Sequence, residues 1–214
     1  MKNNVFFVSG IDTNIGKSYA TGIIARQWNK KGISTITQKL VQTGSPGLSD
    51  DIEMHRKLMG ISFTKEDKAK LTMPEVYTYP ASPHLAAKID NRPIDIQKIN
   101  SATSLLSEQY DAVLIEGAGG LMVPLTPNYL IIDYIKARNY PLIFVTSGKL
   151  GSINHTLLSL EAIKNRDIQL HTVVYNAYPI DKDGTINSDT KMFFKNYVRQ
   201  YFPNTVFIEL PVIE

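Results

Sequence analysis

A short apolar segment followed by a glycine-bounded loop is the feature that most constrains this chain. Residues 5–18 have the sequence Val-Phe-Phe-Val-Ser-Gly-Ile-Asp-Thr-Asn-Ile-Gly-Lys-Ser. Between a strand and a helix, the backbone N–H groups of such a loop and the positive end of the helix form a cradle for phosphate groups. Lys17 adds a positive charge for the terminal phosphates, and the Ser18 hydroxyl is placed to ligate Mg²⁺. The segment therefore predicts a nucleotide-binding protein.

The loop departs from the usual phosphate loop in its length. Five residues separate Gly10 from Gly16, where the usual loop has four. An ordinary strand-to-helix turn would also favour glycine, and Lys and Ser are common where helices start. We favour phosphate binding because the strand, both glycines and the Lys-Ser pair all stand where that function requires them.

Apolar runs and helical patterns alternate along the rest of the chain. Runs that are apolar throughout, separated by helices, indicate an α/β fold: a P-loop NTPase-like parallel sheet with helices on both faces. We expect a single domain over residues 1–214, since α/β domains of this length are commonly one unit. The predicted strands are 4–8, 35–40, 112–115, 141–146, 170–175 and 205–209, and the predicted helices are 17–29, 50–59, 94–109, 128–137, 152–165 and 188–201.

Charge and composition argue against several classes of partner. The 23 basic and 20 acidic residues give a net charge of +3 and are scattered, so nothing indicates a nucleic-acid surface. Without cysteine the chain forms neither a disulfide nor a thiolate metal site, which fits a reducing cytoplasm. No apolar run approaches the roughly 18 to 20 residues that span a bilayer, so we expect no membrane association and a cytoplasmic location.

Polar residues follow the second predicted strand, at the sheet edge where α/β proteins bind ligands. Lys39 could stabilise a transferred phosphoryl group there, or it could simply mark where the strand meets water. Thr43 follows four residues later. Asp50 and Asp51 suit the start of a helix capped by Ser49, and a carboxylate at this place could also reach Mg²⁺. The segment 65–70 is predicted to be a charged surface segment.

A second glycine-rich segment follows the third predicted strand. Glu116 stands at the tip of that strand, and the following Gly-Ala-Gly-Gly (117–120) permits close approach of backbone to a ligand. A strand-end acid can bind Mg²⁺ directly or through water, as in many phosphate-loop enzymes. The alternative is a glycine-rich turn with an incidental acid, but two glycine loops at two strand tips favour one shared site.

Two further strand ends carry candidate binding groups. The segment from Lys149 to His155 leads into a helix whose first backbone amides could hold a carboxylate or a phosphate. We interpret His155 as a packed or surface histidine, because no acidic partner lies near it in the sequence. Asn176 ends a later strand, where its amide could meet a nucleobase edge or form a turn.

These segments, taken in order, resemble the dethiobiotin synthetase family over nearly the whole chain. Residues 10–18 resemble the family's lengthened phosphate loop. Residues 39–44 (Lys-Leu-Val-Gln-Thr-Gly) resemble the segment that carries its catalytic lysine and a substrate-binding hydroxyl. The set is completed by 82–84 (Ser-Pro-His), 116–120 and 149–155.

The resemblance implies an ATP-dependent ligase that converts 7,8-diaminopelargonate and CO₂ to dethiobiotin, with release of ADP and phosphate. One amine becomes a carbamate, ATP phosphorylates it to a carbamic-phosphoric anhydride, and the second amine closes the ring. Mg²⁺ would be the metal cofactor and ATP the co-substrate. The family's active site lies at a dimer interface, which implies a homodimer.

The resemblance also assigns roles to individual residues. The implied catalytic residues, which stabilise charge on the phosphoryl group and the carbamate, are Lys17 and Lys39. The implied metal ligands are Ser18, Asp51 and Glu116. The implied nucleotide-binding residues are Asn14, Ile15, Gly16, Lys17, Ser18, Tyr19, Asp51, Glu116, Gly117, Ala118, Gly119 and Asn176. The implied substrate-binding residues are Thr13 and Thr43 and, from a partner subunit, Lys149, Gly151, Ser152 and Asn154. Asp50 stays open as an alternative to Asp51.

Two segments depart from the family pattern. The residues after Asn176 lack a clear match to the usual base-binding segment. The sequence stops at Glu214, where many relatives continue through another loop and helix. We therefore expect looser discrimination between ATP and other triphosphates.

Three other classes share parts of this pattern. Partitioning ATPases of the deviant phosphate-loop group usually have an additional lysine early in the loop, where this chain has Ile-Asp-Thr (11–13). Amidoligases of the cobyrinate-diamide type usually work with a cysteine-based glutaminase, and this chain has no cysteine. A non-enzymatic nucleotide-binding module would not need Lys39, Thr43 and Glu116 together.

Overall fold

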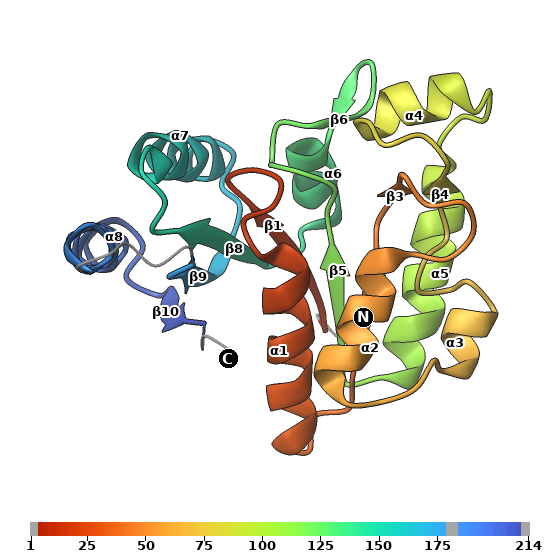
Figure 1. Cartoon of the computed structure of the whole chain (residues 1–214), viewed down its shortest axis with the longest axis horizontal. Helices are drawn as coiled ribbons and strands as arrows, with labels where there is room; N and C mark the ends of the chain where they lie inside the picture. Colours follow the sequence, from red (N-terminus) through yellow and green to blue (C-terminus); the bar gives the residue numbers. More distant parts are fainter. Residues whose placement is uncertain (1–3, 179–183, 211–214) are drawn as a thin grey trace.

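The centre of the fold is a parallel sheet of six strands (Figure 1). The structure, a computed structural model, describes residues 4–178 and 184–210. The strands of the sheet are β1 (Val5–Gly10), β2 (Thr35–Lys39), β5 (Ala112–Glu116), β8 (Leu142–Ser147), β9 (Leu170–Asn176) and β10 (Val206–Glu209). Their order in space is β10-β9-β8-β1-β5-β2, and every neighbouring pair is parallel. The predicted α/β fold class is therefore confirmed.

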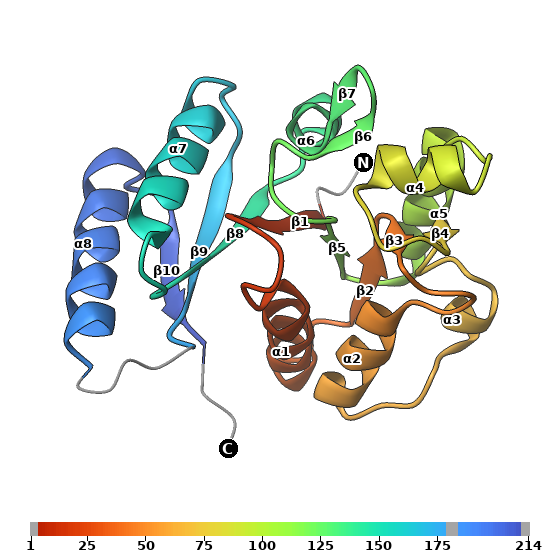
Figure 2. The same cartoon turned by 45° about the horizontal axis from the view of Figure 1, so that its top comes forward.

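Helices cover both faces of this sheet (Figure 2). The main helices are α1 (Lys17–Lys30), α2 (Asp50–Met59), α5 (Ile96–Gln109), α6 (Ile131–Arg138), α7 (Ser152–Lys164) and α8 (Thr185–Tyr201). Side chains alternate along β1, so that Phe7 belongs to the core beneath α5, α6, α7 and α8, and Val8 to the core beneath α1. Within the described ranges, no helix has the length and apolar character needed to cross a membrane.

β1 lies where the strand order changes direction. It pairs with β5 on one side and with β8 on the other, and the chain crosses from β5 over to β8. Ligands bind at such a point, beside the carboxyl ends of the strands. The register places Lys39 opposite Glu116, and Glu116 opposite Val8, so the ends of three strands meet beside the phosphate loop.

Most predicted boundaries lie within three residues of the observed ones, and the shifts have local causes. α5 begins at Ile96 instead of 94 because Asp95 caps it by accepting a hydrogen bond from the Lys98 N–H. α6 begins at Ile131 instead of 128, since the residues before it form a short strand, and α8 begins at Thr185 instead of 188. The sequence did not predict the short elements α3 (Lys65–Lys68), α4 (Pro83–Ile89), β3 (Gln42–Thr43), β4 (Val76–Tyr77), β6 (Pro124–Thr126) and β7 (Tyr129–Leu130).

The close packing of α1 against α2 depends on Gly22. A Cβ atom on Gly22 would lie 2.8 Å from the Cβ of Leu58 and 3.3 Å from the Cα of His55. Any larger residue would therefore push the two helices apart. The distance matters for function because α1 carries Ser18 and α2 carries Asp51, whose side chains meet at the sheet edge.

Candidate active site

The loop between β1 and α1 is held in a tight curl. Gly16 has a φ of 90°, and a Cβ there would lie 2.5 Å from Nδ2 of Asn176, so glycine fits this position best. Asn176 donates a hydrogen bond to the Ile15 carbonyl at 2.9 Å. The Lys17 ammonium donates to the Asp12 carbonyl across the loop. These contacts give the loop the curvature that a phosphate cradle requires.

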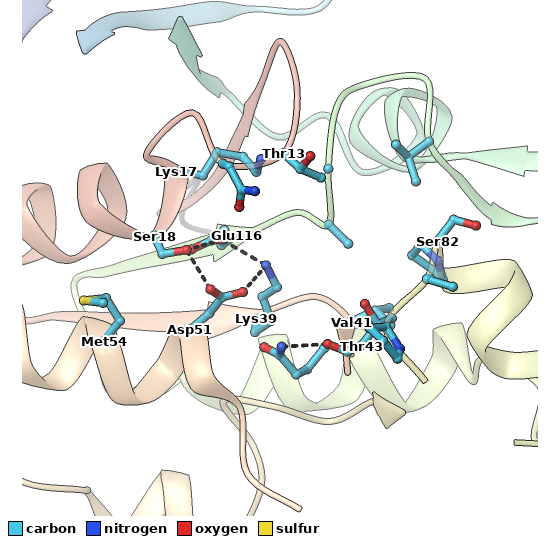
Figure 3. Close-up of a pocket in the computed structure, with 18 of the residues that line it drawn as sticks. Thr13, Lys17, Ser18, Lys39, Val41, Thr43, Asp51, Met54, Ser82 and Glu116 are labelled. Carbon is cyan, nitrogen blue, oxygen red and sulfur yellow. Dashed lines mark hydrogen bonds and ion pairs between the residues drawn. The ribbon is translucent and has the colours of Figure 1, made fainter. Parts of the chain in front are cut away.

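Lys39 occupies the centre of an ion-pair cluster formed by the ends of β2 and β5 and the start of α2 (Figure 3). Its ammonium lies 2.5 Å from Oδ2 of Asp51 and 2.9 Å from Oε1 of Glu116, and it donates to the Gly117 carbonyl at 3.0 Å. Ser18 Oγ lies 2.7 Å from Oδ1 of Asp51 and 2.9 Å from Oε1 of Glu116. Lys39 is buried, so it does not merely mark where the strand meets water.

Burial and neighbouring charges set the pKa values in this cluster. Burial opposes the charged form of Lys39, but the carboxylates of Glu116 and Asp51 outweigh it and raise the pKa of the lysine. Burial also opposes ionised Glu116, but Lys39 and a hydrogen bond from His55 hold the pKa of that carboxyl well below its usual range. Burial lowers the pKa of Lys17 to about 8. The charged form is therefore favoured in Lys39 by its two carboxylate partners and opposed in Lys17 by burial.

A cavity of about 860 Å³ lies between the phosphate loop and the segments that follow β2 and β5. In Figure 3, Lys17 and Thr13 border it on the loop side, whereas Thr43 and Ser82 border it on the opposite side. The predicted site residues that line it are Thr13, Asn14, Gly16, Lys17, Ser18, Tyr19, Lys39, Thr43, Asp51, Glu116, Ala118 and Gly119. The rest of the wall is formed by Val41, Gln42, Met54, Pro80, Ala81, Ser82, Pro83 and Val123.

The oxygen atoms of the cluster fit a divalent cation such as Mg²⁺. Ser18, Asp51 and Glu116 present one hydroxyl and two carboxylates, and Mg²⁺ sites typically combine one or two carboxylates with phosphate oxygens. Ser18 has a single hydroxyl hydrogen for two carboxylate acceptors, so it cannot satisfy both at once. The carboxylate oxygen that the Ser18 hydrogen leaves unpaired is a hard ligand of the kind that such a cation binds.

The two aspartates at the start of α2 lie in different places. Asp51 lies in the cavity, whereas the side chain of Asp50 is exposed and accepts a hydrogen bond from Ser45 at 3.0 Å. Ser49 caps the helix as predicted, by accepting a hydrogen bond from the Ile52 N–H. The geometry favours Asp51 as the metal ligand, and the assignment stays a prediction.

Four predicted substrate-binding residues lie at the start of α7 and do not line the cavity of their own chain. Lys149, Gly151 and Asn154 are exposed, whereas Ser152 is buried and its Oγ has no hydrogen-bond partner among the described residues. His155 is exposed, which agrees with its interpretation as a surface histidine. The structure holds one chain, so the contribution of this segment to a partner subunit's site stays a prediction.

Ile15, Gly117 and Asn176 do not line the cavity. Ile15 and Asn176 support the phosphate loop, whereas the Gly117 carbonyl accepts a hydrogen bond from Lys39. The side chain of Ile15 is buried in the core beneath α1. The side-chain oxygen of Asn176 accepts a hydrogen bond from the Tyr178 N–H at 3.0 Å, as in a turn. Residues 179–183 and 211–214 lie outside the described residues, so the expected loose discrimination among triphosphates stays a prediction.

A buried histidine behind Glu116 was missed by the sequence analysis. His55 is completely buried, with Nε2 2.7 Å from Oε2 of Glu116 and Nδ1 3.0 Å from Oγ1 of Thr37. The available signal was its spacing, because His55 follows Asp51 by four residues and so lies on the same helix face.

A buried ion pair continues this network away from the cavity. Arg56 donates to Thr37 Oγ1 at 2.7 Å and binds both carboxylate oxygens of Asp67 at 2.8 Å. Asp67 also accepts a hydrogen bond from Thr72. The prediction that 65–70 is a surface segment is therefore wrong at Glu66 and Asp67, which are buried; the arginine on α2 draws Asp67 inward.

Comparisons with known proteins identify the family of this chain. Residues 4–214 match the family model described as AAA domain. Relatives named ATP-dependent dethiobiotin synthetase include BioD 2 of Pasteurella multocida, 50% identical over 98% of both chains, and BioD of Chlorobaculum tepidum, 47% identical over 100% of this chain and 87% of the relative. Solved structures include MinD of Aquifex aeolicus, with a TM-score of 0.55 and 14% identity over 96% of this chain and 82% of that chain; this likeness shows the fold alone. The chain belongs to the family of ATP-dependent dethiobiotin synthetases.

Proposed function

We propose that this protein converts 7,8-diaminopelargonate, CO₂ and MgATP to dethiobiotin, ADP and phosphate in biotin biosynthesis. The observation that carries the proposal is the convergence of Lys17, Lys39 and Glu116, from three different segments, on one cavity with the phosphate loop. The names of the relatives support ATP dependence and the class of ligase.

The first two steps create a leaving group. One amine of the substrate attacks CO₂, a C–N bond forms, and a proton leaves the nitrogen to give a carbamate. A carbamate oxygen then attacks the γ-phosphorus of ATP and ADP departs, which gives the carbamic-phosphoric anhydride. Lys39 and Lys17 neutralise charge on the carbamate and on the transferring phosphoryl group, where fixed cations in a buried site act most strongly.

The last step is ring closure. The second amine attacks the carbamate carbon, a second C–N bond forms, the C–O bond to phosphate breaks, and the amine loses a proton. Thr13 and Thr43 lie on opposite sides of the cavity, so their hydroxyls would hold the two ends of the reacting region. Ser18, Asp51 and Glu116 would hold Mg²⁺, which supplies charge neutralisation for the phosphates.

The remainder of the substrate is proposed to bind at a dimer interface. The cavity of a single chain lacks a cationic group at the end away from the lysines among its described lining residues, and a substrate carboxylate needs one. The amides at the start of α7 and Lys149 of a partner subunit would supply it. We further propose that the protein acts as a homodimer in the cytoplasm, without a nucleic-acid or membrane partner.

Phosphate release from MgATP and bicarbonate, with and without the diamine, tests the proposal. The ligase predicts release that requires the diamine, together with formation of dethiobiotin detected by mass spectrometry. Release that proceeds equally without the diamine would refute it and would favour a nucleotide-driven switch ATPase.

A further inference from the structure

His55 lies completely buried behind the carboxylate of Glu116. It does not line the cavity, although it stands on the same helix as Asp51, which does. Any effect of the imidazole on bound ligands must therefore pass through Glu116. If His55 only filled space in the core, its ring volume would be enough and its hydrogen bonds would not matter. The hydrogen bonds of the ring therefore show whether His55 also orients Glu116.

The neighbours of His55 fix which ring nitrogen carries the hydrogen. The guanidinium of Arg56 can only donate, so Thr37 Oγ1 accepts from it at 2.7 Å. A carboxylate can only accept, so Nε2 of His55 carries a hydrogen and donates it to Oε2 of Glu116 at 2.7 Å. In a neutral imidazole Nδ1 is then the acceptor, and it takes the hydroxyl hydrogen of Thr37 at 3.0 Å.

This arrangement gives the two carboxylate oxygens of Glu116 separate tasks. Oε2 is bound by His55 from behind, whereas Oε1 faces Ser18 and Lys39, each at 2.9 Å. A carboxylate held at one oxygen cannot rotate its other oxygen away from the cavity without losing that bond. The orientation of the oxygen that faces the ligands is thus set by a residue that never touches them.

The spacing of the two carboxylates is also set by α2. Asp51 and His55 stand one helical turn apart on that helix, so one rigid face places the first carboxylate directly and the second through the imidazole. The helix itself is fixed against α1 at Gly22.

We propose that His55 is a positioning residue that presents Oε1 of Glu116 to Mg²⁺ and the phosphoryl group, with its ring hydrogen on Nε2 held by Oε2 of Glu116 and its Nδ1 facing Thr37. The part of the inference that concerns Mg²⁺ rests on the proposed function. The part that concerns the tautomer of His55 rests on geometry alone. Outer residues that orient ligands in this way typically change metal affinity by about 10- to 100-fold.

Binding of Mn²⁺ in the presence of ADP, followed by electron paramagnetic resonance, tests the part of the inference that concerns Mg²⁺. His55→Leu removes the donor, and we expect Mn²⁺ to bind about tenfold more weakly or worse. His55→Gln keeps an N–H group near the position of Nε2 and should recover most of the affinity. The matched control is His171→Leu, at a half-buried histidine that contacts Phe6 and Thr172, and it should bind Mn²⁺ as the unaltered protein does. Equal affinity in His55→Leu and the unaltered protein, or no recovery in His55→Gln, would overturn the proposal.

Nitrogen-15 NMR of the nucleotide-free protein tests the tautomer, with the signals of His55 assigned by their loss in His55→Gln. We expect the pattern of an imidazole protonated at Nε2, and a pattern protonated at Nδ1 would overturn the proposal. Thr37→Val removes the hydroxyl that holds Nδ1 and is nearly the same size, so it provides a second variant if His55→Leu does not fold. The imidazole then loses one of its two hydrogen bonds, and we expect weaker Mn²⁺ binding; an unchanged affinity would count against the positioning role of His55.

Turnover separates this inference from the proposed function. If the ligase is correct, His55→Leu raises the Mg²⁺ concentration needed for half-maximal turnover while KM for the diamine stays near that of the unaltered protein. If the unaltered protein shows no diamine-dependent turnover but the Mn²⁺ and NMR results hold, the ligase proposal fails and the positioning role of His55 stands.

Discussion

Replacement of Lys39 by methionine tests whether this lysine stabilises the folded protein by neutralising the carboxylates of Asp51 and Glu116. Without the lysine, the same carboxylates would be free to bind a metal ion. The ammonium uses its three hydrogens on Asp51, Glu116 and the Gly117 carbonyl. Methionine has a similar length but no charge. In the variant, two carboxylates remain close to the single hydroxyl of Ser18 without their cation.

The expected loss of stability follows from the burial of each partner. Removal of one member of a buried ion pair costs about 3–5 kcal/mol. The lower end applies, because the Asp51 side chain is 26% exposed and Glu116 keeps its hydrogen bond from His55. In a chain of this length, 1 kcal/mol corresponds to about 2–4 °C in Tm, so a loss of about 3 kcal/mol lowers Tm by about 6–12 °C.

Mg²⁺ should reverse much of this loss in the variant. The freed oxygens of Asp51 and Glu116 are those that Lys39 occupies, so Mg²⁺ without nucleotide should bind the variant more tightly than the unaltered protein. A ligand at 100 times its Kd contributes about 2.7 kcal/mol, close to the stability that was lost.

Scanning calorimetry with and without MgCl₂, at matched ionic strength, measures both effects. The control is Lys98→Met, because Lys98 also pairs with a buried carboxylate, Glu75, at 3.0 Å, but its side chain is 53% exposed and Arg92 remains in place. We expect that control to lose less than about 1 kcal/mol and to show no special response to Mg²⁺. The reasoning would be refuted if Lys39→Met had the same Tm as the unaltered protein, or if Mg²⁺ raised the Tm of both proteins equally.

Three further variants test other parts of the structure. Gly22→Ala should lower the free energy of unfolding by about 1–3 kcal/mol and weaken MgATP binding, because the added methyl separates α1 from α2; urea unfolding and ATP titration that match the unaltered protein would contradict this. Asp51→Asn should raise the Mg²⁺ requirement for turnover far more than Asp50→Asn, and equal effects would reject the choice between them. Burial opposes the ionised form of Asp67, but Arg56 and other hydrogen-bond donors lower its pKa, so the unfolded chain takes up this proton first as the pH falls below the ordinary value of 3.8. Asp67→Asn should therefore cost about 3–5 kcal/mol near neutral pH, with the difference from the unaltered protein shrinking in acid, and a difference that does not change with pH in urea unfolding would argue against the ion pair.

The parts of the site that could be predicted are those that the topology of a parallel sheet fixes. A parallel strand delivers its last residue to the same edge as its neighbours, so Lys39 and Glu116 are predictable as soon as their strands are. The phosphate loop is equally local, since the strand, the glycines and the helix start all lie within residues 5–18.

The network behind Glu116 could not be predicted in this way. Whether His55 points to the sheet depends on the rotation of α2, which its contact with Gly22 of α1 sets from far away in the sequence. Asp67 turns inward only because Arg56 approaches it, while its charged neighbours suggest a surface. Strands of two residues, such as β3, are too short for any periodicity to show.

The central position of β1 has a consequence for how the molecule is made. Its neighbour β5 ends at Glu116 and its neighbour β8 ends at Ser147, so both of its edges stay unpaired until most of the chain has left the ribosome. Pairings between segments so distant in the sequence form slowly. Until they form, the apolar strand β1 is exposed, so the nascent chain is prone to aggregate and to bind chaperones. Nascent chains released before Ser147 should therefore precipitate or be degraded.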